Sequence, residues 1–126
     1  MNMKGKGTKA ERELLHMFWR NNWACTRCAG SGSMQYDSPD LIAGHGEKKI
    51  CIECKSTSSN IQYFSKEEIF SLRSFCHLFG AEPYVGVRFD NKPWVFCRIN
   101  KLKETKRFFC LSEDRDTKSF EELISD

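Results

Sequence analysis

A helix predicted between two pairs of strands is the feature that most constrains the fold of this chain. Ser65 and Glu68 have the spacing of a capping box, which marks the first turn of a helix. Apolar residues then recur at helical spacing up to a glycine that can end the helix, so we expect it over residues 65–79. Strand-like runs precede it at residues 41–55 and follow it at residues 84–99. The helix therefore crosses between strands of one sheet.

The rest of the pattern extends this sheet and adds helices at both ends. A capped, amphipathic segment predicts a first helix over residues 8–20, and a β-prone run follows at residues 23–28. Residues 108–111 indicate an edge strand, and residues 119–124 a short terminal helix. The order αβββαβ predicts an α/β fold with a mixed central sheet flanked by helices.

Length and composition indicate one folded domain. The chain has 126 residues, of which 40% are hydrophobic and 29% charged, as in globular domains. No linker divides it, so we expect a single domain over residues 1–126, with an acidic segment from about residue 113. Neither a membrane span nor a signal peptide is visible, which predicts an intracellular protein without a membrane partner, acting in host cytoplasm if it is viral. Most of the seven cysteines should then be reduced.

The charge is unevenly distributed along the chain. Residues 113–126 contain six acidic and two basic residues, a net charge of −4, so the preceding part carries +7. The opening segment alone contains Lys4, Lys6, Lys9 and Arg12. This distribution favours a polyanionic partner, although a merely basic surface would give the same pattern.

Charged residues on an interior strand are the strongest chemical signal. Glu53 and Lys55 lie two positions apart in an apolar run, so their side chains share one face of the strand. Asp40 precedes the neighbouring strand and brings a third charge to the same place. A structural Glu–Lys ion pair with an exposed Asp40 would also explain the pattern, but an ion pair is a weak reason to place charge on a central strand.

Two carboxylates and an amine suit phosphodiester hydrolysis. Asp40 and Glu53 offer oxygen ligands for Mg²⁺, with Mn²⁺ able to take its place, and Lys55 would orient the attacking water. Glu11 has two interpretations. It closes a capping box with Thr8, and it also shares a helix face with apolar residues that would direct its carboxylate inward.

Asp40, a gap of twelve residues and then Glu53-Cys54-Lys55 resemble the PD-(D/E)xK nuclease signature, including Pro39. A closer similarity, over about residues 4–99, is to the archaeal Holliday junction resolvases, and it is weak after about residue 100. The segments that carry it are Lys4-Gly5-Lys6-Gly7, Ala10-Glu11-Arg12-Glu13-Leu14, Arg27, Ala29-Gly30-Ser31-Gly32-Ser33, Pro39-Asp40-Leu41-Ile42-Ala43-Gly44, Ile52-Glu53-Cys54-Lys55, Phe79-Gly80-Ala81 and Val85-Gly86-Val87-Arg88-Phe89.

The resemblance implies a restriction-endonuclease-like fold and an Mg²⁺-dependent, structure-selective endodeoxyribonuclease. Such an enzyme makes paired, symmetric nicks in four-way DNA junctions during recombination and repair. The implied catalytic residues are Glu11, Asp40, Glu53, Lys55 and Ser31, of which the three acidic residues serve the metal. The resemblance implies that Arg12 and Arg27 contact DNA and that Ser31 acts near the scissile phosphate. Together with Lys6, Lys9 and Ser33, these are the predicted DNA-binding residues.

The resemblance also implies a homodimer. Phe75 and Phe79 form an aromatic pair one helical turn apart, a pattern that more often belongs to a core than to an interface. In the resembled family, however, this helix contributes aromatic residues to a two-fold interface. Two identical active sites about one axis would match the near two-fold symmetry of a four-way junction.

Two other functions stay open at this stage. A PD-(D/E)xK nuclease could act on duplex or flapped DNA instead. A non-catalytic, zinc-binding nucleic-acid module is the alternative from another class, because Cys25/Cys28 and Cys51/Cys54 form two C-x-x-C pairs. Each pair lies in a strand-like run, however, where residues three apart point to opposite faces rather than toward one metal ion.

Overall fold

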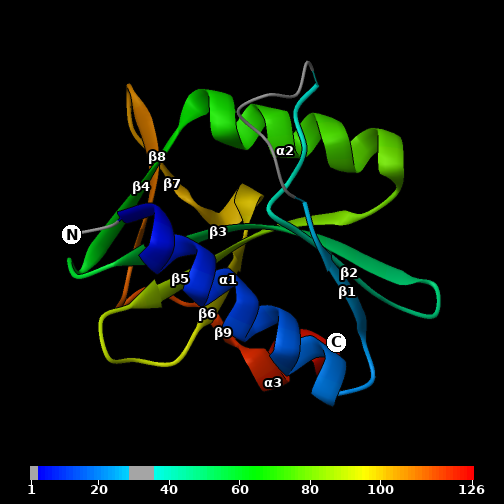
Figure 1. Cartoon of the computed structure of the whole chain (residues 1–126). Helices are drawn as coiled ribbons and strands as arrows, with labels where there is room; N and C mark the ends of the chain where they lie inside the picture. The colour runs from blue at the N-terminus through cyan, green and yellow to red at the C-terminus, as the bar shows by residue number, and fades with distance from the viewer. Residues whose placement is uncertain (1–2, 29–35) are drawn as a thin grey trace.

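The computed structural model describes residues 3–28 and 36–126, and its main feature is a sheet with helices on both faces (Figure 1). The helices are α1 (Met3–Arg20), α2 (Lys66–Phe79) and α3 (Phe120–Ser125), with a 3₁₀ turn η2 (Ile99–Lys101). The strands are β1 (Ala24–Arg27), β2 (Leu41–His45), β3 (Lys48–Thr57), β4 (Ile61–Ser65), β5 (Glu82–Phe89), β6 (Val95–Arg98), β7 (Lys103–Glu104), β8 (Phe108–Ser112) and β9 (Lys118–Ser119). Among the described residues, no helix is both long and apolar enough to span a bilayer.

The main sheet has the strand order β1-β2-β3-β5-β6-β9. Strands β3 and β5 are parallel, and the other neighbouring strands of this sheet are antiparallel. The connection from β3 to β5 passes through β4 and α2, because parallel strands need a crossover. The predicted mixed sheet, with a helical crossover between its strands, is therefore confirmed.

A second, three-stranded sheet has the order β4-β8-β7. The sequence predicted that residues 108–111 would lie at the edge of the main sheet, and this was wrong. Residues 61–65, for which no strand was predicted, form β4, and β8 pairs with β4 in antiparallel register. In that register Phe108 lies opposite Ser65, the residue that immediately precedes α2.

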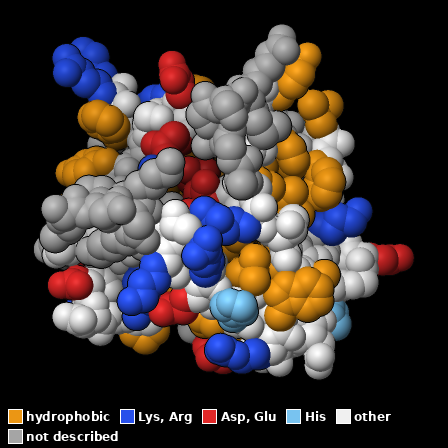
Figure 2. Space-filling view, viewed as in Figure 1, with side chains coloured by type: hydrophobic (Ala, Val, Ile, Leu, Met, Phe, Trp, Pro, Cys, Tyr) orange, Lys and Arg blue, Asp and Glu red, His pale blue; other side chains and the backbone are white. Residues whose placement is uncertain are grey.

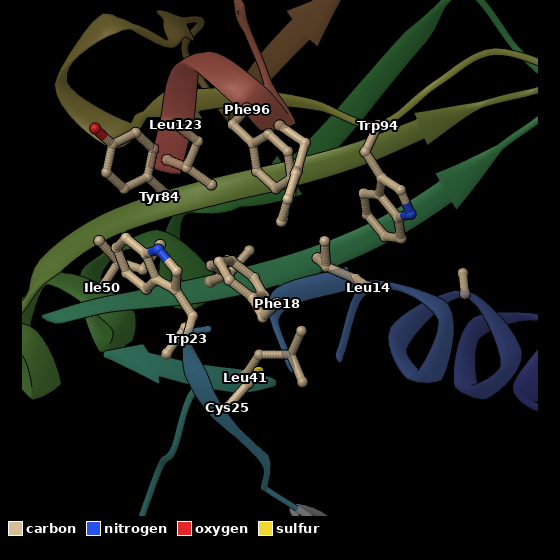
Figure 3. Packing of buried hydrophobic residues seen from close by; sticks show 14 residues of the cluster. Leu14, Phe18, Trp23, Cys25, Leu41, Ile50, Tyr84, Trp94, Phe96 and Leu123 are labelled. Atoms are coloured by element: carbon tan, nitrogen blue, oxygen red, sulfur yellow. The ribbon is translucent and has the colours of Figure 1, made fainter. Parts of the chain in front are cut away.

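Two apolar cores lie on the two faces of the main sheet. On one face, α1 and α3 bury Leu14, Phe18 and Leu123 against the strands (Figure 3). The Phe18 ring meets the Phe120 ring edge-on, with 5.1 Å between their centroids. On the other face, α2 buries apolar residues together with side chains of the second sheet.

The predicted end of α2 is found, whereas the predicted start of α1 is wrong. Ser65 caps α2 within a capping box, and Gly80 ends it in the left-handed conformation, with φ of 84°. The first helix was predicted to begin at residue 8, but α1 begins at Met3. The Thr8 hydroxyl accepts a hydrogen bond from Arg27 at 3.4 Å instead of capping a helix. Thr8 thus serves a tertiary contact between α1 and β1.

Candidate active site

Asp40 lies opposite Glu53, at the point where β2 begins. Leu41 pairs with Ile52 in the antiparallel β2–β3 register, so the preceding residue, Asp40, faces Glu53. The Cys54 backbone N–H donates a hydrogen bond of 2.8 Å to Asp40 Oδ2. This bond fixes the Asp40 carboxylate against β3, although Asp40 itself precedes the strand. The hairpin predicted from the sequence therefore brings the two carboxylates together.

Glu53 and Lys55 lie on the face of β3 that carries α2. Cys51, on this face, belongs to the core under α2, whereas Ile52 and Cys54 pack in the core under α1. A cleft of about 710 Å³ is lined by Glu11, Asp40, Glu53 and Lys55, among others. Asp40 and Glu53 also line a hollow of about 290 Å³ on the side of α2. Figure 2 shows acidic side chains in the region between α1 and α2, with basic side chains nearby.

The two facing carboxyl groups are electrostatically unfavourable as a pair. Burial, together with the negative charge of Asp40, raises the pKa of Glu53 to about 9. Burial also raises the pKa of Asp40, against hydrogen bonds from the Cys54 N–H and from Glu53 and against the charge of Lys55. Without a further cation, the folded protein thus holds protons at this site that exposed carboxylates would release.

This donor set fits a hard divalent cation. Mg²⁺ is bound in enzymes by one or two carboxylates, with waters and substrate phosphate completing its shell. Asp40 and Glu53 provide two carboxylates in direct contact, and a cation between them would relieve their repulsion. Within the described ranges, no three histidine, cysteine or acidic side chains are grouped as a preformed metal cluster.

Lys55 is held by Glu68, a residue that sequence reasoning placed only in the helix cap. Lys55 Nζ lies 2.7 Å from Glu68 Oε2, and both side chains are about one-third exposed. Burial lowers the pKa of Lys55, but the Glu68 carboxylate, together with the charges of Glu53 and Asp40, outweighs burial and leaves this pKa raised. Because the capping-box pattern fully accounts for Glu68, no sequence signal pointed to its second contact.

Glu11 is directed toward the site but is bound to Arg27 of β1. Arg27 Nε lies 3.3 Å from Glu11 Oε1, and the Glu11 side chain is 17% exposed. Burial and the charge of Asp40 raise the pKa of Glu11, while Arg27 opposes the rise. Of the two interpretations of Glu11, the helix cap is wrong, because α1 already begins at Met3. Arg27, expected to contact DNA, is engaged in this ion pair.

The other predicted DNA-binding residues are only partly described. Lys9 and Arg12 are exposed on α1, the helix that also carries Glu11. The backbone of Lys6 lies in α1, but its side chain lies outside the described part of the structure. Ser31 and Ser33 also lie outside the described residues, so their predicted roles stay predictions.

The cysteines of the two C-x-x-C pairs lie on different faces of the sheet. Cys25 and Cys54 pack in the core under α1, whereas Cys51 belongs to the core under α2. Cys25 and Cys51 are at most 7% exposed. Four ligands of one zinc ion must converge, and these cysteines point into different cores. The zinc-module alternative is therefore wrong for these residues.

Phe75 and Phe79 form the expected aromatic pair on α2. Their rings are stacked, with 5.4 Å between the centroids. Phe75 packs against the core, whereas Phe79 is 44% exposed and borders an apolar hollow that Trp19 and Ile42 also line. Hydrophobic side chains gather near the C-terminal end of α2 on the right of Figure 2. The pair thus reaches from the core to the surface.

Comparisons with known proteins agree with these features. The family model "Archaeal holliday junction resolvase (hjc)" matches residues 2–126, including the C-terminal part that the sequence motifs did not reach. The "Crossover junction endodeoxyribonuclease Hjc" of Archaeoglobus fulgidus is 38% identical over 88% of this chain and 82% of its own length. The Methanocaldococcus jannaschii protein of that name is 37% identical over 69% of this chain and 62% of its own.

A solved structure shows the same fold. It is described as Archaeoglobus fulgidus Hjc, a Holliday junction resolvase from an archaeal hyperthermophile. It superposes with a TM-score of 0.88 at 32% sequence identity and covers 93% of this chain and 98% of its own chain. The predicted restriction-endonuclease-like fold is therefore confirmed.

Proposed function

This chain belongs to the archaeal Holliday junction resolvase family, and on that premise we propose that it is an endodeoxyribonuclease that resolves four-way DNA junctions. The observation that carries the proposal is the meeting of Asp40, Glu53 and Lys55 in one cleft. Two facing carboxylates beside a lysine provide a cation site and a group that can orient water, which phosphodiester hydrolysis requires.

Nucleases of this family type depend on a metal ion, and we assign Mg²⁺, with Mn²⁺ able to replace it. Asp40 and Glu53 would hold the ion, and the Glu11 carboxylate of α1 would add a further negative charge beside it. When bound, the ion supplies positive charge against the negative charge that develops on the phosphate. The Lys55 ammonium orients the attacking water and favours its deprotonated form. We assign Ser31, on the family resemblance, a role near the scissile phosphate.

We assign DNA binding to basic residues around the cleft. Lys9 and Arg12 are exposed on α1, and Lys6 precedes them on the same helix. These side chains would contact phosphates and read the shape of the junction rather than its sequence. Arg27, which is paired with Glu11, would contact the DNA backbone beside the acidic site.

We also infer a homodimer that uses the exposed aromatic end of α2. Phe79 is 44% exposed beside an apolar hollow of about 480 Å³, and Phe75 supports it from the core side. An isologous contact places the same patch of each subunit against its copy. Two active sites related by this axis would cut two symmetric strands of one junction.

A cleavage assay with two substrates tests the proposed function. The purified protein is incubated with a labelled four-way junction and with linear duplex of the same arm sequence, in Mg²⁺, in Mn²⁺ and in EDTA. We expect paired, symmetric nicks in the junction only, in either metal and not in EDTA. Equal cutting of both substrates would instead indicate a general duplex nuclease, and no cutting of either would refute the proposal.

A further inference from the structure

Glu68 uses its two carboxylate oxygens for two different purposes. Oε1 accepts a hydrogen bond of 2.9 Å from the Ser65 backbone N–H, which completes the cap of α2. Oε2 lies 2.7 Å from Lys55 Nζ, on a different element of the fold. The residue therefore joins the helix cap to the lysine of the candidate active site.

The second capping box of the chain shows what a cap alone requires. In α3, Glu122 Oε1 accepts a hydrogen bond of 2.9 Å from the Ser119 N–H, and the Glu122 N–H donates to Ser119 Oγ at 3.1 Å. Within the described ranges, no ion pair is found for Glu122. The cap geometry is thus complete without a lysine, and the Lys55 contact is an additional feature of Glu68.

Lys55 needs such a partner if its ammonium is to keep one position. A lysine side chain has four rotatable bonds, and Lys55 also faces the Asp40 and Glu53 carboxylates. The Glu68 carboxylate is itself fixed by the cap, because Oε1 accepts a hydrogen bond of 2.9 Å from the Ser65 backbone N–H. A partner fixed in this way restricts where the ammonium can lie.

We propose that Glu68 is a positioning residue, which holds the Lys55 ammonium in place for its role at the attacking water. The inference rests on the proposed function, since it presumes that Lys55 acts in cleavage. An ion pair between partly exposed groups contributes little to stability, so stability alone is a weak reason for this contact. Cleavage is where a misplaced lysine would have its largest effect.

The test replaces Glu68 with glutamine and compares matched variants. In Glu68→Gln, the amide oxygen can still accept from the Ser65 N–H, but the charge facing Lys55 is removed. We expect kcat on the four-way junction to fall about 10- to 100-fold, with junction affinity and melting temperature close to those of the parent protein. Glu122→Gln makes the same change in a cap without a lysine and should leave kcat unchanged.

The converse variant weakens the cap and keeps the charge. Ser65→Ala removes the hydroxyl that accepts from the Glu68 N–H, while the Ser65 backbone N–H still donates to Glu68 Oε1. We expect Ser65→Ala to lower the melting temperature and to keep kcat. If its activity fell as that of Glu68→Gln does, Glu68 would act through helix stability, and the proposal would be wrong.

A double-mutant cycle with Lys55→Ala separates this proposal from the proposed function. If Glu68 acts through Lys55, Glu68→Gln has no further effect on kcat in the Lys55→Ala background. A further decrease there would assign Glu68 a direct role and overturn the positioning proposal. Full activity of Lys55→Ala would instead refute the role of the lysine itself, and with it the proposed mechanism.

A measurement without DNA or metal completes the test. The metal-free protein is treated briefly with an amine-acetylating reagent, and modification of Lys55 is compared with that of exposed Lys9 by mass spectrometry. Release from Glu68 should make Lys55 several-fold more reactive in Glu68→Gln and leave it unchanged in Glu122→Gln. Equal reactivity of Lys55 in all three proteins would mean that Glu68 does not hold the ammonium.

Discussion

Asp40 faces Glu53 across the start of the β2–β3 pair, and the charge of Asp40 helps burial to raise the pKa of Glu53 to about 9. Glu53 lies on β3, whereas Asp40 immediately precedes β2, so the pairing of these two strands brings the carboxyl groups together. A buried pair of carboxyl groups is unfavourable by itself and favourable around a cation. This relationship leads to the first two predictions.

Asp40→Asn should abolish cleavage without unfolding the protein. The asparagine oxygen can still accept the Cys54 N–H, so the hairpin is preserved, but one of the two negative charges is removed. We expect the cleavage rate to fall by about a thousandfold, with junction binding retained, as measured by single-turnover cleavage and by gel shift in EDTA. Exposed Asp114→Asn is the control. Loss of binding in Asp40→Asn would contradict the assigned role.

Without metal, the stability of the protein should fall as the pH rises. The unfolded Glu53 loses its proton near pH 4.5, whereas the folded residue keeps it up to about pH 9. Between these values the folded state binds more protons than the unfolded state, so the free energy of unfolding decreases with increasing pH.

Thermal unfolding in EDTA from pH 5 to pH 8.5 measures this slope. Glu53→Gln should flatten it and should be more stable than the parent protein at the alkaline end. Mg²⁺ should stabilise the parent protein more at pH 8.5 than at pH 5, because the metal competes with the proton. A parent protein whose stability in EDTA rises over this range would contradict the prediction.

The β2–β3 hairpin could be predicted from sequence because its signals are local. Alternation along residues 49–55 fixes which side chains share a face, and the hairpin sets the register. The second sheet could not be predicted in this way. β4 and β8 are far apart in the sequence, and the apolar run 108–111 carries no information on which strand edge it joins. The start of α1 was predicted wrongly for a related reason. Thr8 has the residue type of a helix cap, but its hydroxyl binds Arg27, which is distant in the sequence.

Arg12→Ala should weaken junction binding in a salt-dependent way. Arg12 is exposed on α1, and we assign it to phosphate binding. In the Asp40→Asn background, which prevents cleavage, the slope of log affinity against log salt should become shallower by about one for each phosphate that Arg12 neutralises. Arg20→Ala, at the C-terminal end of α1, should leave the slope unchanged. An unchanged slope for Arg12→Ala would exclude phosphate binding by this residue.

Phe79→Ala should convert the proposed dimer to monomer. The variant removes an exposed ring that borders the apolar hollow, so the core should be little affected. Sedimentation velocity at micromolar concentration measures the mass, with Leu78→Ala as control, because Leu78 is 87% exposed on the same helix. A dimeric Phe79→Ala variant would place the interface elsewhere. A monomeric parent protein would exclude the dimer altogether.

Gly86→Ala should destabilise the sheet at its centre. A Cβ atom on Gly86 of β5 would lie 3.0 Å from Phe96 and 3.1 Å from Ile52, which is closer than normal contact. The substitution overpacks the core under α1 and should cost about 1–3 kcal/mol, measured by urea denaturation. Gly7→Ala on α1, where a Cβ atom meets nothing within 4 Å, should be neutral or stabilising. Equal stability of the two variants would contradict this packing.

The acidic centre of the site follows from sequence, but the groups around it do not. Asp40, Glu53 and Lys55 lie within one hairpin, so their spacing was informative. The partner of Lys55 comes from α2, and its position in a capping box already explained its residue type. Arg27 was predicted to contact DNA, yet its side chain forms an ion pair with Glu11, because β1 lies beside α1. Contacts between separate elements leave no local pattern to detect.

The parallel pairing of β3 with β5 also governs when the site can form during folding. Glu53 and Lys55 lie on a strand whose second neighbour is reached only after β4 and α2 have been placed. Pairing over such a long loop is slow, because the chain must give up loop-closure entropy before the contacts form. The early β2–β3 hairpin would bring the acidic pair together with only one edge of β3 covered. Cleavage competence should therefore appear late in refolding, together with burial of the β3–β5 ladder and not with formation of the hairpin.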